Sequence, residues 1–219
     1  MPDGPTDDVR AAASRAGLDA TGRHGGPATS PEYRVQPERT VGLLATALTR
    51  LHSIPAGDQP TDPPAATRGD GPVLGALRVA QAAQEALSEG RLAEPDAGSV
   101  YGHLPVERLV EVLVSGAPDV ADRSGAAVLC HGAPTLEHLW CDRGEVVGFV
   151  EWQRAVWADP YLDLAIAARD VAGVLTPLLV PELFERYGET RPDPIRVDWW
   201  ALAAELTGAF DPGGGTEPA

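Results

Sequence analysis

Apolar residues recur at spacings of three and four along much of the chain, which is the repeat of a helix with one buried face. The first clear run consists of Val41, Leu44, Leu48 and Leu51. Pro37 suits the first turn of such a helix. Pro55 would end it, because proline has no amide hydrogen to donate to the helix. The pattern therefore predicts a helix between these two prolines.

Two further helices are expected before the middle of the chain. The second helix has its stripe at Leu74, Leu77, Ala80, Ala83 and Leu87, and Gly90 follows. The third opens at Leu104-Pro105 and has its stripe at Val106, Leu109, Val110 and Leu113. Gly116 is expected to close it, since glycine readily adopts the left-handed conformation found at many helix ends. Near the C-terminus the pattern predicts three more helices, at 162–175, 181–187 and 197–210.

The segments rich in β-forming residues are few and short. Ala126–Cys130 is an apolar run typical of a strand. Leu139–Cys141 and Val146–Val150 flank Asp142-Arg-Gly-Glu145, which is a plausible hairpin turn. The expected fold is therefore α+β, predominantly α, with one small β-hairpin.

The two ends of the chain have a different composition from its middle. Residues 1–36 are rich in glycine, proline, alanine and aspartate, with at most a short helix around Val9–Ala16. We expect a disordered or irregular tail over 1–36, an ordered domain over 37–210 and a flexible tail over 211–219.

The charge of the chain limits the classes of partner that it can be expected to bind. The net charge is −15, and all 17 basic residues are arginine. Such an acidic chain is not expected to bind nucleic acid, although it could attract a small cation. It has no apolar run of the ~20 residues needed to cross a bilayer and no secretory leader pattern. We expect a cytoplasmic protein whose two cysteines, Cys130 and Cys141, are reduced.

The densest motifs lie between Val128 and Ala165. In order, they are His131-Gly-Ala133, His138, Glu151, Arg154 and Ala158-Asp-Pro-Tyr-Leu-Asp-Leu-Ala165. They resemble the aminoglycoside phosphotransferase family of the kinase-like fold, whose pattern is His-Gly-Asp, four residues, Asn, a strand ending Ile-Asp, and then Ala-Asp-x-x-x-Asp-Leu-Ala. The helix ending Leu51-His-Ser-Ile-Pro55 and the C-terminal helices also resemble that family. The resemblance covers about Pro37 to Phe210 and implies the C-terminal, substrate-side lobe of such a kinase.

The departures from the family pattern fall at the positions that carry the chemistry. Ala133 stands where the resemblance implies the base aspartate, so no side chain there can accept a proton. His138 replaces the asparagine and Glu151 replaces the metal-binding aspartate, which leaves at most a weak, vestigial metal pair. The resemblance implies that His131 braces the loop and that Asp163 supports it. Asp159 with Pro160 is better suited to capping the next helix than to catalysis.

The family's ATP-binding lobe, which precedes the helix at Pro37, is expected to be absent. Residues 1–36 contain no lysine to hold phosphates and are too few to form that lobe. The favoured function is a pseudoenzyme without a cofactor, which binds a small cationic ligand, or a protein partner at the exposed lobe interface. One alternative is an active, ATP- and magnesium-dependent phosphotransferase completed by another chain. The other is a gene fragment without a function.

Two acidic groups are candidates for holding a cationic ligand. Glu94-Pro-Asp-Ala97 stands where the resemblance implies the aminoglycoside-binding segment, but it has few acids. Glu182, Glu185, Glu189 and Glu205 could line an acidic pocket, although a solvated helix face is the more common reason for such charges.

Overall fold

The computed structural model describes residues 7–19, 24–54, 73–95 and 97–207. The helices are α1 (Asp7–Arg15), α2 (Pro31–Arg34), α3 (Pro37–His52), α4 (Ala76–Ser88), α5 (Val106–Arg123), α6 (Tyr161–Val174), α7 (Val180–Tyr187) and α8 (Pro194–Thr207). The strands are β1 (Gly26–Pro27), β2 (Val128–Cys130), β3 (Leu139–Asp142), β4 (Glu145–Phe149) and β5 (Val156–Ala158). Two short 3-10 helices are η2 (Trp152–Arg154) and η3 (Pro177–Leu179). The predicted α+β class with a small hairpin is confirmed, and the predicted tail 211–219 lies outside the described residues.

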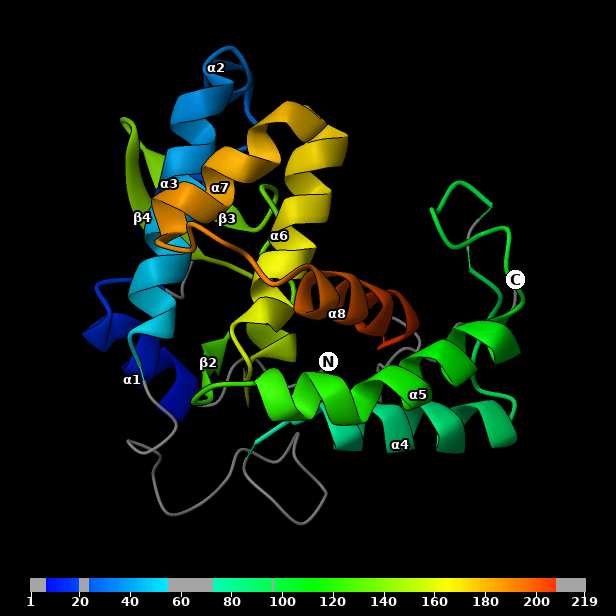
Figure 1. The fold of residues 1–219 in the computed structure, drawn as a ribbon. Helices are drawn as coiled ribbons and strands as arrows, with labels where there is room; N and C mark the ends of the chain where they lie inside the picture. Colours follow the sequence, from blue (N-terminus) through cyan, green and yellow to red (C-terminus); the bar gives the residue numbers. More distant parts are fainter. Residues whose placement is uncertain (1–6, 20–23, 55–72, 96, 208–219) are drawn as a thin grey trace, which may run out of the picture.

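Helix α6 is the centre of the fold. It packs against α3 and α7 on one side and against α8 on the other, and α8 in turn packs on α4 and α5 (Figure 1). Eight of its residues are buried, from Tyr161 to Val171, so it has almost no solvated face over its first three turns. A helix that is apolar all round is expected at such a place.

Helix α3 forms where the apolar repeat predicted it. Val41, Leu44, Leu48 and Leu51 are all fully buried. The helix begins at Pro37 and ends at His52, before the proline that was expected to stop it. Together these side chains hold α3 against α7 and the strands β2 and β4.

Helix α4 buries a face that overlaps the predicted one at Ala80 and Ala83 but leaves Leu77 outside. Leu77 is 59% exposed, and Leu74 lies before the helix, in a bridge to Ala158. The buried face consists of Ala76, Val79, Ala80, Ala83 and Ala86. Helix α4 packs against α5, and its small buried alanines let the two helices approach closely.

The prediction that Gly116 ends the third helix was wrong. Helix α5 continues through Gly116 and Pro118 to Arg123. A Cβ atom at Gly116 would lie 2.9 Å from Cδ1 of Trp199. The glycine therefore makes room for the Trp199 ring, whose Nε1–H donates to the Leu113 carbonyl at 2.9 Å.

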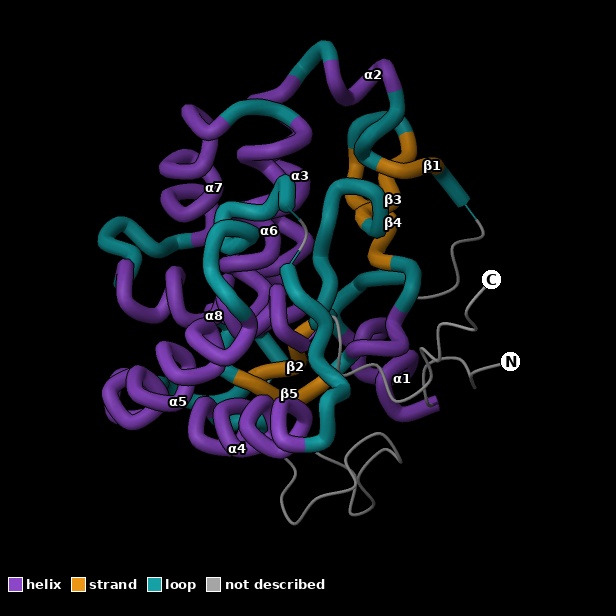
Figure 2. The backbone as a smooth tube through the Cα atoms, turned by 90° about the vertical axis from the view of Figure 1, so that its right-hand side faces the viewer, coloured by secondary structure: helices purple, strands orange, loops and turns teal. Residues whose placement is uncertain are grey.

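Two small antiparallel sheets lie beside the helices (Figure 2). One sheet has the strand order β1-β3-β4, and the other pairs β2 with β5. Residues Arg143 and Gly144 both have positive φ, which is typical of the tight turn that joins β3 to β4. The hairpin was predicted, whereas β1 and β5 are too short to leave a pattern in the sequence.

The structure differs from the irregular tail expected over 1–36. Within the described part of that segment, α1 buries Val9, Ala12 and Ala13, and β1 pairs with β3. Asp19 donates its backbone N–H to the carbonyl of Val147 at 2.8 Å, on the outer strand β4. The segment is therefore attached to the domain through the hairpin.

Four of the tryptophans are buried. Trp152, Trp157, Trp199 and Trp200 are each at most 6% exposed. None of the helices in the described part of the chain is long and apolar enough to cross a membrane.

Candidate functional site

The loop that joins β2 to β3, residues 131–138, is attached to α6 by a buried carboxylate. Asp163 accepts the backbone N–H groups of His131 at 2.7 Å and of Gly132 at 2.8 Å, one on each oxygen. Gly132 has φ +80°, and a Cβ atom there would lie 2.2 Å from the carbonyl oxygen of Arg154. The His-Gly pair thus lets two successive amides point at one carboxylate, which fixes the start of the loop.

His131 is fully buried beside this carboxylate. Its Nε2–H donates to the Val150 carbonyl at 2.8 Å, and its Nδ1 accepts the N–H of Ala133 at 3.3 Å. The ring also stacks near Phe149 and Trp152. Burial lowers the pKa of His131 from 6.5 to about 4, so the ring is neutral and links the start of the loop to Val150, just after β4.

Ala133 and His138 lie across the loop from each other. Nδ1 of His138 is 2.7 Å from the Ala133 carbonyl oxygen, and because that oxygen can only accept, the imidazole donates from Nδ1. Both backbone groups of Ala133 are therefore used within the loop, and its methyl group offers no acceptor.

Glu151 follows β4 in a left-handed backbone conformation, with φ 60° and ψ 57°. Its side chain is exposed and accepts a hydrogen bond from Nε2 of Gln153 at 2.9 Å. Non-glycine residues with positive φ are uncommon and often occur at functional positions.

The metal pair of His138 and Glu151 stays a prediction, and in the described part of the chain neither residue belongs to a group of three donors close enough to share an ion. Among the residues that the structure describes, three donors close enough to share an ion occur only at His52, Cys130 and Asp163. Magnesium prefers six oxygen ligands, whereas that cluster contains a thiol and an imidazole, and both oxygens of Asp163 already accept amide hydrogens. This buried cluster therefore does not fit magnesium.

Asp159 joins three helices rather than facing the loop. Its Oδ1 accepts the N–H of Tyr161 at 2.9 Å, near the start of α6, as expected for a capping residue. The same carboxylate accepts hydrogen bonds from Ser124, which follows α5, and from Arg196 in α8. The Arg196 guanidinium also lies over the Tyr161 ring, 3.8 Å from its centroid.

His52 is a site residue that sequence reasoning did not select. From the end of α3, its Nε2 lies 3.1 Å from Oδ2 of Asp163 and its Nδ1 lies 2.8 Å from the hydroxyl of Tyr187. With Nε2–H donated to the carboxylate, Nδ1 of the neutral ring accepts the hydroxyl hydrogen of Tyr187. The signal was the Leu-His-x-x-Pro motif, which was used for the resemblance and not for the site.

Asp170 was also missed. It lies seven residues after Asp163 on α6, and its Oδ2 accepts the N–H of Leu136 at 2.7 Å. Burial raises the pKa of Asp170, while the nearby Leu136 amide and His138 favour its charged form. A spacing of seven residues places both aspartates on one face of the helix, and this could have been read from the sequence.

The structure gives the members of the two predicted acidic groups different contacts. Glu94 accepts the N–H of Val106 at 3.1 Å and so caps α5, while Asp96 lies outside the described residues. Glu182 pairs with Arg186, and Glu205 pairs with Arg169. Glu185 and Glu189 line a groove between α7 and α8 instead.

Comparison with known proteins identifies the family that has this arrangement. The model of the "Phosphotransferase enzyme family" matches residues 12–200, which is most of the chain. The chain belongs to the phosphotransferase enzyme family. The match begins well before Pro37, where the resemblance was expected to start, and so includes part of the N-terminal segment.

Two curated relatives are both named aminoglycoside 3'-phosphotransferase. The chain is 32% identical over 175 residues to an aminoglycoside 3'-phosphotransferase of Escherichia coli and 31% identical to one of Salmonella typhimurium. Each match covers 80% of this chain and 59% of the relative. The chain thus spans about three fifths of the length of these relatives.

Solved structures agree on the fold. An aminoglycoside phosphotransferase from Streptomyces rimosus has a TM-score of 0.65 at 23% identity, over 84% of this chain and 67% of that one. A choline/ethanolamine kinase family protein from Mesorhizobium loti has a TM-score of 0.62 at 17% identity, over 94% and 70%. The predicted kinase-like fold is confirmed.

Proposed function

We propose that this member of the family is a pseudoenzyme that binds a small cationic ligand beside the 131–138 loop and does not phosphorylate it. The observation that carries the proposal is Ala133. In the family pattern this position holds the aspartate that accepts the proton of the substrate hydroxyl. A methyl group cannot accept a proton, and the backbone groups of Ala133 bond to His131 and His138.

The other carboxylates near the loop are engaged in hydrogen bonds within the protein. Oε2 of Glu137 accepts the Thr29 hydroxyl hydrogen, and Oδ2 of Asp170 accepts the Leu136 amide. The carboxylate of Glu151 accepts a hydrogen bond from Gln153. Each of the three thus has a hydrogen-bond partner other than a substrate hydroxyl.

The same carboxylates support a cationic ligand. Glu137 lies on the loop and Asp170 bonds to its Leu136 amide, while the loop carries no positive side chain between His131 and His138. The chain has a net charge of −15. The curated relatives are named for aminoglycosides, which are polycationic sugars. Negative surfaces of this kind raise the local concentration of cations.

The test combines binding and turnover. Kanamycin should raise the melting temperature of the full chain by mass action, and Asp170→Asn should reduce that rise. Glu111→Gln, on the exposed face of α5, serves as the matched control and should not. Mass spectrometry after incubation with kanamycin and Mg-ATP should detect no phosphorylated product.

Three results would overturn the proposal. The first is phosphorylated kanamycin that disappears with Glu151→Ala, which would show an active enzyme. The second is an equal loss of kanamycin binding in Asp170→Asn and Glu111→Gln. The third is the absence of any kanamycin-dependent stabilisation, which would leave a protein partner as the ligand.

A further inference from the structure

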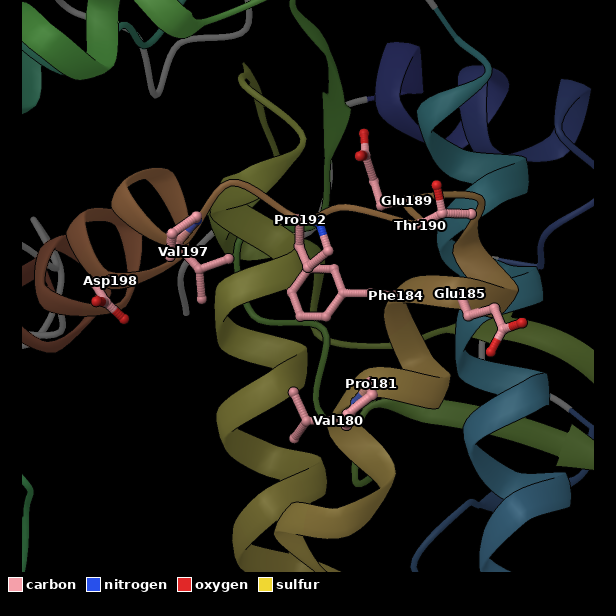
Figure 3. Close-up of a pocket in the computed structure, with 10 residues that line it drawn as sticks. Val180, Pro181, Phe184, Glu185, Glu189, Thr190, Pro192, Val197 and Asp198 are labelled. Carbon is pink, nitrogen blue, oxygen red and sulfur yellow. The ribbon is translucent and has the colours of Figure 1, made fainter.

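A groove of about 470 Å³ lies between α7 and the start of α8 (Figure 3). All the residues that line it fall within 180–198, so none belongs to the 131–138 loop. Its size is within the range of small-molecule binding pockets. It is a second candidate site, separate from the one beside Ala133.

The body of the groove is apolar. Phe184, only 4% exposed, forms the floor, with Val180, Val197 and Pro192 around its ring (Figure 3). Pro181 and Pro194 complete the apolar lining. Prolines restrict the backbone on either side of the floor, so the shape of the groove is largely preset before any ligand arrives.

The polar side chains of the groove are mostly negative. Glu185, Glu189 and Asp198 line it together with Thr190, and no lysine, arginine or histidine does. In Figure 3 the three carboxylates stand at the edges of the groove, Asp198 on one side of the Phe184 ring and Glu185 and Glu189 on the other. An apolar floor with a negative rim is complementary to a molecule with an apolar body and a positive end.

Within the described part of the chain, the three groove carboxylates differ from their neighbours in having no arginine partner. Glu182, Asp193 and Glu205 belong to the same part of the chain, and each bonds to an arginine: Arg186, Arg123 and Arg169 respectively. Among the described residues, Glu185, Glu189 and Asp198 form no such ion pair. The carboxylates that face the groove are thus the ones left without a positive partner, and a cationic ligand would supply it.

We propose that this groove binds a small amphipathic ammonium compound, with its apolar body on Phe184 and its ammonium group at the negative rim that carries Glu185, Glu189 and Asp198. The apolar part gains from leaving water. The ammonium group keeps its solvation at the rim, where exposed carboxylates contribute modestly. Binding should therefore need both parts of the ligand.

The test uses the full chain and 2-phenylethylammonium as the probe, with affinity measured by calorimetry and by the fluorescence of Trp199 and Trp200, which directly follow Asp198. The neutral analogue 2-phenylethanol and the polyamine spermidine, which lacks an apolar body, are compared with it. We expect both to bind at least about ten-fold more weakly than the probe. High salt should weaken binding of the probe and leave that of the alcohol unchanged.

Variants locate the site. The combined change Glu185→Gln, Glu189→Gln and Asp198→Asn should weaken probe binding by about ten-fold or more, and each single change should weaken it by less. Glu182→Gln, on the same helix but paired with Arg186, is the matched control and should bind the probe as the parent chain does.

The proposal is overturned if the alcohol binds as tightly as the ammonium compound, if the combined variant binds the probe unchanged, or if Glu182→Gln shows the same loss. Absence of measurable probe binding overturns it as well. Kanamycin binding that depends on Asp170 is measured separately, so failure of one site leaves the test of the other intact.

Discussion

Nε2 of His52 lies 3.1 Å from Oδ2 of Asp163, although the two residues are 111 positions apart and lie on different helices. Tyr187 continues the contact on the far side of the imidazole. The chain of hydrogen bonds thus runs from α7 through α3 to α6, and from there to the first two amides of the 131–138 loop. The loop takes its shape from three helices that are distant in sequence.

Replacing Asp163 by alanine should destabilise the protein strongly. The side chain is fully buried, and its loss would leave two amides and the His52 ring without an acceptor. We expect a cost of about 3–5 kcal/mol in the free energy of unfolding, measured by urea denaturation. Tyr187→Phe, which removes only the last hydrogen bond of the chain, should cost about 1 kcal/mol. A cost for Asp163→Ala no larger than that for Tyr187→Phe would contradict this account.

Gly116 and Gly173 should respond to alanine with opposite signs. In an ordinary helix interior, alanine is favoured over glycine by about 1 kcal/mol. Nothing lies within 4 Å of a Cβ atom placed at Gly173, so Gly173→Ala should stabilise the protein by that order. At Gly116 the added methyl would press on Trp199, and we expect a loss of about 1–3 kcal/mol. Thermal unfolding of the two variants measures both, and stabilisation by Gly116→Ala would be inconsistent with the tight packing.

His131 should make the stability depend on pH below neutrality. Its pKa is 6.5 when free and about 4 in the fold, so between these values the unfolded chain binds more protons than the folded one. The stabilisation is complete above about pH 6.5 and is lost as the pH falls towards about 4, by about 3 kcal/mol. Denaturation curves across this window measure the loss. His131→Gln should flatten this part of the profile, and an unchanged slope in that variant would rule the residue out as its source.

His138 should matter for the loop more than for the rest of the fold. Its Nδ1–H is donated to Ala133 at 2.7 Å, a hydrogen bond worth about 1 kcal/mol. His138→Ala should lose that amount, while His138→Asn, whose amide can still donate, should lose less. Hydrogen exchange of the amides at 133–139 gives the local readout. Equal protection of these amides in both variants would show that the contact does not hold the loop.

The helices could largely be predicted because their information is local. Helix α3 has four large apolar residues at helical spacing and a proline at its start, and nothing elsewhere in the chain overrides that pattern. The buried face of helix α4 could be predicted less well, because its small alanines are buried and its larger Leu77 is exposed. The prediction that Gly116 ends a helix failed for a related reason. The role of this glycine is set by Trp199, 83 positions away, which no local rule can include.

The site was predicted in part because its motifs are contiguous. His131, Asp159 and Asp163 bond as bracing and capping residues would, although their roles in function remain predictions. The sequence did not reveal that His52 meets Asp163 or that Asp170 reaches the Leu136 amide, because both contacts depend on the packing of α6 against other elements. Nor did it show that Glu185 and Glu189 share a groove from which Glu182 is excluded.

The bond between Asp19 and Val147 has a consequence for the behaviour of the protein in solution. Strand β4 is the outer strand of its sheet, and an uncovered outer strand is a template on which other molecules can polymerise. Asp19 takes one carbonyl of that strand, and its backbone passes so close to Gly148 that a Cβ atom there would lie 2.0 Å from the Asp19 oxygen. A chain shortened to remove residues 7–19 would lose this contact and leave that part of the strand edge open to pairing with another molecule.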